Sequence, residues 1–109
     1  MKSRKSRPPK IDDLLSVIKT CIEAGRYFSC LHLEQREDER NITRREVLHV
    51  LRNGFHEKKE DDFDEGYRVW HYAIRGKTLD NRDLRVFVSF DKESFMIIIT
   101  TFEIGSLKP

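Results

Sequence analysis

The chain has 109 residues, which is enough for one domain with a single modest hydrophobic core. Charged residues make up 37% and hydrophobic residues 38% of it, and no apolar run is long enough to span a membrane, so we expect a cytoplasmic globular protein without a membrane partner. The formal net charge of +2 is compatible with a polyanionic partner but does not demand one.

The N-terminal part of the sequence is predicted to be an arm followed by a helix. Residues 1–10 are basic and contain a Pro-Pro pair, which favours a flexible arm before a single domain at residues 11–104. Apolar residues at helical spacing then predict a first helix over residues 11–24, and Gly25 is placed to end it.

Two more helices are predicted before the pattern changes. Ser29 is a candidate N-cap for a second helix over residues 29–40, which has a short apolar side and a strongly charged one. A third helix is predicted over residues 44–53, because Thr43 and Glu46 have the spacing of a capping box.

After Gly54 the apolar residues alternate, which is typical of strands. A short edge strand is predicted at residues 55–59 and longer strands at residues 67–74, 84–90 and 95–102. The acidic segment at residues 60–65 is predicted to be a mobile loop remote from any RNA surface, because its like charges repel each other and phosphate. Helices followed by strands predict an α+β fold, with N-terminal helices packed on a three- to four-stranded antiparallel sheet.

His32, Arg36 and Arg40 are the sharpest candidates for a functional site. They recur every four residues, so a helix would place them on one face. Two guanidinium groups one turn apart can hold a phosphate, and an imidazole beside them can transfer a proton near neutral pH. The alternative is that the arginines pair with neighbouring acids or brace the sheet, and the spacing alone leaves both interpretations open.

The order His32-x3-Arg36-x3-Arg40-x-Ile42-Thr43, followed by a helix that ends at Gly54, resembles a family of small bacterial domains of unknown function. That family is grouped with the RelE/ParE-like (MqsR-type) toxins, and the resemblance covers residues 27–102. It implies a RelE-like fold and the toxin of a type II toxin–antitoxin system. Such a toxin is a metal-independent endoribonuclease that cleaves RNA by attack of a ribose 2′-OH on the adjacent phosphate, without a cofactor.

The same resemblance implies roles for individual residues and partners. His32 would transfer protons, while Arg36, Arg40 and Arg82 would stabilise the charge that develops on phosphorus. Lys77 and Arg85 would bind RNA phosphates from a basic sheet face. The implied partners are RNA, including ribosome-bound mRNA, and a cognate antitoxin, for which a zinc-finger protein is one form.

Several candidates have a structural interpretation that competes with the functional one. Lys77 is equally well explained as a solvated hairpin charge, and Arg85 as a half-buried, paired one. Trp70 and Tyr72 share a strand face and are interpreted as packing residues, with a platform for base stacking as the alternative. Cys21 and Cys30 lack metal-ligand spacing, so we expect no metal site and interpret both as buried thiols in a reducing compartment.

Two other functions therefore remain open beside the endoribonuclease. One is a non-catalytic domain of the same fold that binds protein or nucleic acid, which the near-neutral net charge and the density of acidic residues favour. The other is a structural domain in which the histidine and the arginines hold a helix to the sheet.

Overall fold

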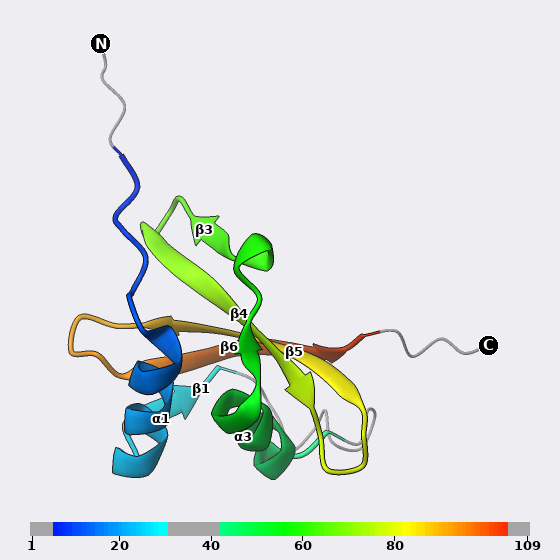
Figure 1. The fold of residues 1–109 in the computed structure, drawn as a ribbon. Helices are drawn as coiled ribbons and strands as arrows, with labels where there is room; N and C mark the ends of the chain where they lie inside the picture. Colours follow the sequence, from blue (N-terminus) through cyan, green and yellow to red (C-terminus); the bar gives the residue numbers. More distant parts are fainter. Residues whose placement is uncertain (1–5, 31–41, 105–109) are drawn as a thin grey trace.

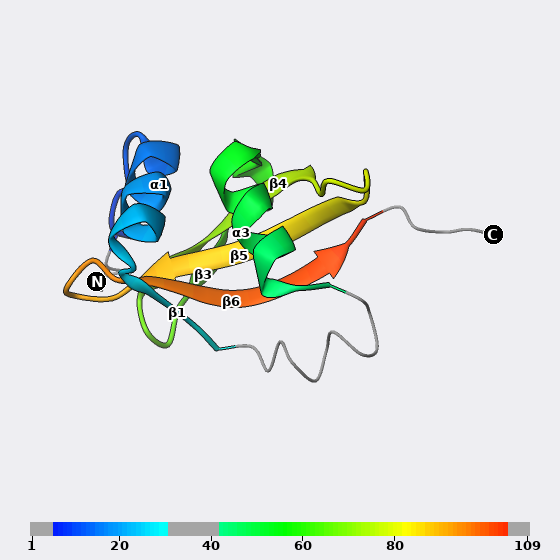
Figure 2. The same ribbon diagram turned by 90° about the horizontal axis from the view of Figure 1, so that it is seen from below.

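A mixed β-sheet organises the fold, and two helices lie on one of its faces (Figure 1, Figure 2). The computed structural model describes residues 6–30 and 42–104. The helices are α1 (Leu14–Ala24) and α3 (Arg44–Asn53), with one 3-10 turn, η1 (Lys58–Glu60). The strands are β1 (Tyr27–Ser29), β2 (Phe55–His56), β3 (Asp62–Asp64), β4 (Val69–Lys77), β5 (Asp83–Phe90) and β6 (Met96–Glu103).

The strand order is β1-β6-β5-β4-β2, and β3 pairs with the first part of β4. Strands β4, β5 and β6 form the expected antiparallel meander, so the α+β class is confirmed. The predicted number of three to four strands is wrong, because the described residues form six, and β1 runs parallel to β6. The two unexpected strands, β1 and β3, have only three residues each, which is too short for a periodic signal in the sequence.

The beginning of the predicted second helix is also corrected. Tyr27–Ser29 is strand β1, paired with Met96–Ile98 of β6, so Ser29 is not a helix N-cap. Pairing with a central strand here prevails over the local capping signal. The rest of that predicted helix lies outside the described residues.

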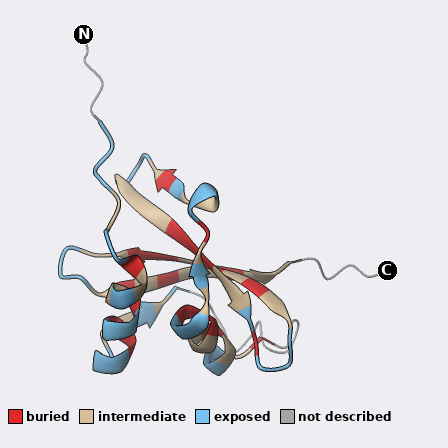
Figure 3. Ribbon diagram, in the orientation of Figure 1, coloured by how far each residue is buried: buried red, intermediate tan, exposed pale blue. Residues whose placement is uncertain are grey.

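The core lies between the two helices and the sheet (Figure 3). Helix α1 starts three residues later than expected, because Asp13 has a left-handed backbone (φ 53°) that a helix cannot contain. Gly25 ends α1 as predicted, in the left-handed conformation that glycine adopts without strain. The two helices bury seven side chains against the sheet, namely Leu14, Ile18, Cys21, Ile22, Val47, Val50 and Leu51.

Helix α3 has the predicted bounds, and its capping box is present. The N–H of Glu46 donates to Oγ1 of Thr43 over 3.1 Å, and the N–H of Thr43 donates to Oε1 of Glu46 over 3.0 Å. Each bond satisfies a backbone donor that the helix itself leaves free, which stabilises the helix by about 1 kcal/mol. The capping box therefore accounts for the accurate prediction of this helix start.

The acidic segment is not the mobile loop that its charge predicts. Residues 62–64 form β3, and Phe63 is buried against Trp70 of β4. The side chain of Asp61 is fully buried, where it accepts the N–H of Ala73 over 2.9 Å. Burial of one aromatic ring and one paired carboxylate outweighs the repulsion among the remaining acids, which lie at the surface.

No helix in the described part of the chain is long and apolar enough to cross a membrane.

Two glycines allow the end of α3 to approach β4 closely. A Cβ atom added at Gly54 would stand 2.7 Å from the carbonyl oxygen of Val50 and closer still to that of Arg75, and both are backbone atoms. The Cα atom of Gly54 would in turn lie 3.0 Å from a Cβ added at Gly76. This approach brings β2 beside β4 and places Glu57, the residue after β2, against the sheet.

The substitution Gly54→Ala should therefore destabilise the fold by about 1–3 kcal/mol, because the backbone must shift to relieve the overlap. Urea unfolding followed by circular dichroism measures the change. Gly66→Ala is the matched control and should change the free energy of unfolding by less than about 0.5 kcal/mol, since only the side chain of Asp64 approaches that position. Equal effects of the two substitutions would contradict the close approach.

Candidate functional site

The sheet face opposite α1 and α3 carries the candidate site. Side chains alternate along a strand, so Tyr72 and Ile74 of β4 face the helices while His71 and Ala73 face the other side. Two adjoining hollows of about 490 and 740 Å³ lie on this side, and both are lined by His71 and Ile99. We call this surface, with its two hollows, the open face.

A β-bulge shapes the open face. Phe87 pairs with Thr100 and Val88 pairs with Ile98, so Ile99 of β6 has no partner on β5. An extra residue of this kind bends its strand and re-aims its side chain. Here Ile99 lines both hollows, beside Phe87 in the smaller one and beside Ile97 and Phe90 in the larger one.

The charges around the hollows are mostly negative. Five carboxylates and two lysines line them, which are Glu60, Asp61, Asp62, Asp64, Asp91, Lys59 and Lys92. The imidazole of His71 lies between these groups, with Nε2 3.7 Å from Oδ2 of Asp64. The open face thus combines an apolar centre with a rim of net negative charge.

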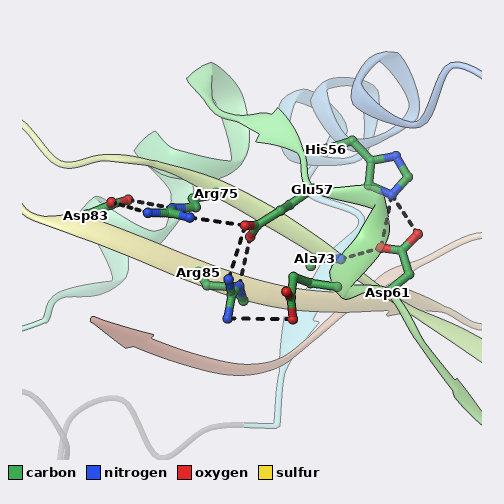
Figure 4. A network of polar contacts seen from close by, with 8 residues as sticks. His56, Glu57, Asp61, Ala73, Arg75, Asp83 and Arg85 are labelled. Atoms are coloured by element: carbon green, nitrogen blue, oxygen red, sulfur yellow. Dashed lines mark hydrogen bonds and ion pairs between the residues drawn. The ribbon is translucent and has the colours of Figure 1, made fainter. Parts of the chain in front are cut away.

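A buried ion-pair network lies at one end of the open face (Figure 4). The side chain of Glu57 is only 7% exposed and accepts hydrogen bonds from Nε and Nη2 of Arg85 over 2.8 and 3.1 Å, and from Nη1 of Arg75 over 3.1 Å. Arg75 also donates two hydrogen bonds to Asp83, over 3.1 and 2.7 Å. The hydrogen bonds from Arg85 and then Arg75 hold the pKa of Glu57 below its ordinary value of 4.5, against the opposing effect of burial.

A second buried carboxylate anchors the turn η1. Oδ2 of Asp61 lies 2.8 Å from Nε2 of His56 and 2.9 Å from Nζ of Lys10, while Oδ1 accepts the N–H of Ala73. Asp61 therefore ties residues before α1, strand β2 and strand β4 together. It also lines the smaller hollow of the open face.

The predicted site residues do not form one cluster within the described residues. His32, Arg36 and Arg40 lie outside them. Nη2 of Arg82 donates to Oε2 of Glu46 over 2.6 Å, and its Nε donates to Asp80 over 3.3 Å, so this arginine joins α3 to the turn before β5. Arg85, which lies on β5, instead pairs with Glu57, the residue after β2.

The structural interpretations of Arg85 and Lys77 agree with the geometry. The side chain of Arg85 is 17% exposed and paired with Glu57, as the interpretation of a half-buried, paired residue requires. Lys77 is exposed at the end of β4, opposite Asp83. Their predicted contact with RNA stays a prediction.

The aromatic side chains of β4 are packing residues. Tyr72 is buried, and its hydroxyl accepts the N–H of Ile11 over 3.0 Å. Trp70 packs against the core, and its Nε1–H donates to the carbonyl of Pro8 over 2.8 Å. The expectation of buried thiols holds for Cys21 only, because Cys30 is exposed.

Sequence reasoning missed Glu57, Asp61 and His71 as organising residues. A signal exists for Glu57: Arg75 and Arg85 stand directly opposite each other on β4 and β5, and two like charges in that position destabilise the pair unless a carboxylate offsets their repulsion. This opposition depends on the register between β4 and β5, and the sequence pattern predicts the strands but not their register. No comparable signal marks His71.

Two further findings concern possible metal ligands and the similarity of the chain to known proteins. Within residues 6–30 and 42–104, no three His, Cys, Asp or Glu side chains are arranged to hold a metal ion. A family model for a domain of unknown function, DUF4258, matches residues 30–103. Neither a curated protein nor a solved structure matches the chain.

The network around Glu57 predicts a loss of stability in acid. A carboxylate whose folded pKa lies below its unfolded value stabilises the fold fully above the unfolded value, and this contribution is lost as the pH falls through the folded pKa. Glu57→Gln should lower the free energy of unfolding by about 1.5–3 kcal/mol at neutral pH, since it removes hydrogen bonds between charged groups.

The same substitution should flatten the fall in stability between about pH 5 and pH 3, because one titrating group is gone. Urea unfolding across that range measures both effects. Glu23→Gln, at an exposed position of α1, is the matched control and should keep the wild-type slope. A variant Glu57→Gln with the wild-type slope would show that this carboxylate does not titrate with unfolding.

The pairing of Arg82 predicts a structural role for that residue. Arg82→Ala should destabilise the fold by about 1–3 kcal/mol, because Glu46 and Asp80 lose a charged donor and Glu46 is largely shielded from water. Arg52→Ala, at an exposed position in the last turn of α3, is the control and should have little effect in the same thermal unfolding measurement. An unchanged melting temperature for Arg82→Ala would remove the structural interpretation.

Proposed function

We propose that this chain, which belongs to the DUF4258 family of domains of unknown function, is a protein-binding module whose partner docks on the open face. The observation that carries the proposal is the pairing of an apolar centre, around Ile99 and Phe87, with a rim of four carboxylates and two lysines, the buried Asp61 not being counted. The partner is a protein segment that presents apolar and basic side chains together.

The apolar centre supplies the attraction. Ile97, Ile99 and Phe87 are half-buried and lie on the side of the sheet away from α1 and α3. Covering them would remove apolar surface from water, which is worth about 25 cal/mol per Å². An apolar centre inside a polar rim is also the usual anatomy of a protein interface.

The charged rim selects the kind of partner. Carboxylates outnumber lysines around the hollows, so the rim attracts basic side chains and repels phosphate. RNA binding depends on lysine and arginine that are available to neutralise phosphates. In this domain Arg75 and Arg85 are already neutralised by Glu57 and Asp83, which favours a protein partner over RNA.

The second candidate is the RelE-like endoribonuclease toxin that the resemblance implies. Its catalytic residues would be His32, Arg36, Arg40 and Arg82, its partners RNA and an antitoxin. Two observations favour it: helices precede an antiparallel β4–β5–β6 meander, and His71 shares a hollow with Lys59, so a group that can transfer a proton lies near a cation.

Peptide display with the full chain tests the leading proposal. The wild-type protein should enrich random peptides that combine lysine or arginine with apolar residues, and added salt should weaken their binding. Ile99→Lys should reduce binding about tenfold or more, because it places a cation at the centre of the face and removes apolar contact. Leu79→Lys makes the same change at an 80% exposed position in a turn and should bind as the wild type does.

Selection of acidic peptides, or equal binding by Ile99→Lys and the wild type, would refute the open face as the docking surface. Induced expression in bacteria separates the second candidate. An endoribonuclease would deplete bulk mRNA and arrest growth, and Arg36→Ala would abolish both while unfolding near the wild-type temperature. A protein-binding module would leave bulk mRNA intact in the wild type and the variant alike.

A further inference from the structure

The segment before α1 is seated on the β3–β4 hairpin. Nη2 of Arg7 lies 3.0 Å from Oε2 of Glu65, and its guanidinium carbon lies 4.9 Å from the centre of the Phe63 ring. Pro8 accepts the indole N–H of Trp70 over 2.8 Å. The segment thus contributes a cation and a carbonyl to the contact, and the hairpin contributes a carboxylate and two aromatic rings.

Lys10, three residues after Arg7, makes contacts of the same kind. Its Nζ lies 2.9 Å from Oδ2 of Asp61 and 4.6 Å from the centre of the Trp70 ring. At the other end, Arg68 of the hairpin donates to the carbonyl of Ser6 over 2.7 Å. Both basic side chains of the segment therefore combine a carboxylate partner with an aromatic face.

This combination is the chemistry by which folded domains bind proline-containing segments. Two consecutive prolines hold the backbone extended before binding, so little entropy is lost when it docks. An aromatic side chain that donates a hydrogen bond to a carbonyl of the extended segment fixes the position of that segment along the binding surface. Acidic residues select the cations that flank the prolines. A cation over an aromatic face contributes about 0.5–1 kcal/mol at an exposed site.

We infer that the hairpin surface formed by Asp61, Phe63, Glu65 and Trp70 is a docking site for basic diproline segments. We call it the hairpin dock. Its ligand in this chain is the sequence Arg-Pro-Pro-Lys at residues 7–10, which occupies it reversibly. A protein segment of the same chemistry, supplied from another molecule, binds the hairpin dock in exchange for the chain's own segment. Its aromatic side chains, Trp70 and Phe63, lie on the other side of β4 from His71 of the open face, and the two surfaces share Asp61.

Trp70 is the only tryptophan in the chain, so its fluorescence reports directly on the hairpin dock. The full-length variant Arg7→Glu/Pro8→Gly/Pro9→Gly should release the segment, because it adds repulsion from Glu65 and removes the preformed extended backbone. Its Trp70 emission should shift to longer wavelength as the indole meets water. Lys19→Glu, with the same change of charge at an exposed position of α1, should leave the emission unchanged.

A synthetic peptide of residues 1–12 should bind the released variant saturably and restore the wild-type emission. The same peptide carrying the three substitutions should not bind. The wild-type protein should bind the native peptide about tenfold more weakly or worse, because its own segment leaves few sites free. Binding of the substituted peptide, equal binding by wild type and released variant, or an unshifted emission in a folded released variant would each overturn the inference.

A charge exchange keeps the test decisive if the released variant fails to fold by circular dichroism. Arg7→Glu alone should shift the Trp70 emission, and Arg7→Glu/Glu65→Arg should return it toward the wild-type value, because the two exposed side chains attract again. A shift that the second substitution does not reverse would show that the ion pair between residues 7 and 65 does not hold the segment, and the hairpin dock would be rejected.

Discussion

The domain depends on one buried carboxylate between two arginines. Arg75 and Arg85 face each other across β4 and β5, and Glu57 accepts hydrogen bonds from both. Without that anion the two cations would repel each other and separate the strands at this point. Glu57 reaches them only because the contact between Gly54 and Gly76 holds β2 close to β4. A tight backbone approach and a buried acid thus hold β2, β4 and β5 together where Arg75 and Arg85 meet.

This arrangement decides which charges remain available for binding. The two arginines of the predicted RNA site that lie within the described residues are held by carboxylates: Arg85 by Glu57, and Arg82 by Glu46 and Asp80. For either one to bind phosphate, a carboxylate would have to give up its partner, and Glu57 would do so in a largely buried position. The acids that line the hollows of the open face therefore dominate its field, which is why its charge suits a basic protein segment.

Prediction from sequence succeeded where a local signal carries the information. Helix α3 was placed correctly because Thr43 and Glu46 mark its start and Gly54 marks its end. Strands β5 and β6 were placed within a residue or two because their apolar residues alternate or run continuously. Strand β1 was not predicted, and its last residue, Ser29, was interpreted as a helix N-cap, because three residues show no period and only the parallel partner β6 defines the strand.

The candidate site was harder to predict than the fold, because it depends on contacts between distant segments. Half-burial and pairing of Arg85 followed from its place on a strand, but its partner Glu57 lies 28 residues away, and the register that joins them is not local. The acidic segment at residues 60–65 was misjudged for the same reason. Its charges predict repulsion when counted alone, but two other parts of the chain contact the one acid that is buried: Lys10 forms an ion pair with it, and the ring of His56 lies within hydrogen-bond distance of it.

Asp61 also connects the two surfaces that this domain offers to partners. Its side chain has no exposure to water, receives Lys10 from the segment seated on the hairpin dock, and lines the smaller hollow of the open face. Removing Lys10 from the hairpin would leave His56 and the N–H of Ala73 as the remaining described partners of this carboxylate. A buried charge that loses a partner must gain another or draw its neighbours closer. Asp61 is therefore the side chain through which release of the segment would reach the wall of the hollow.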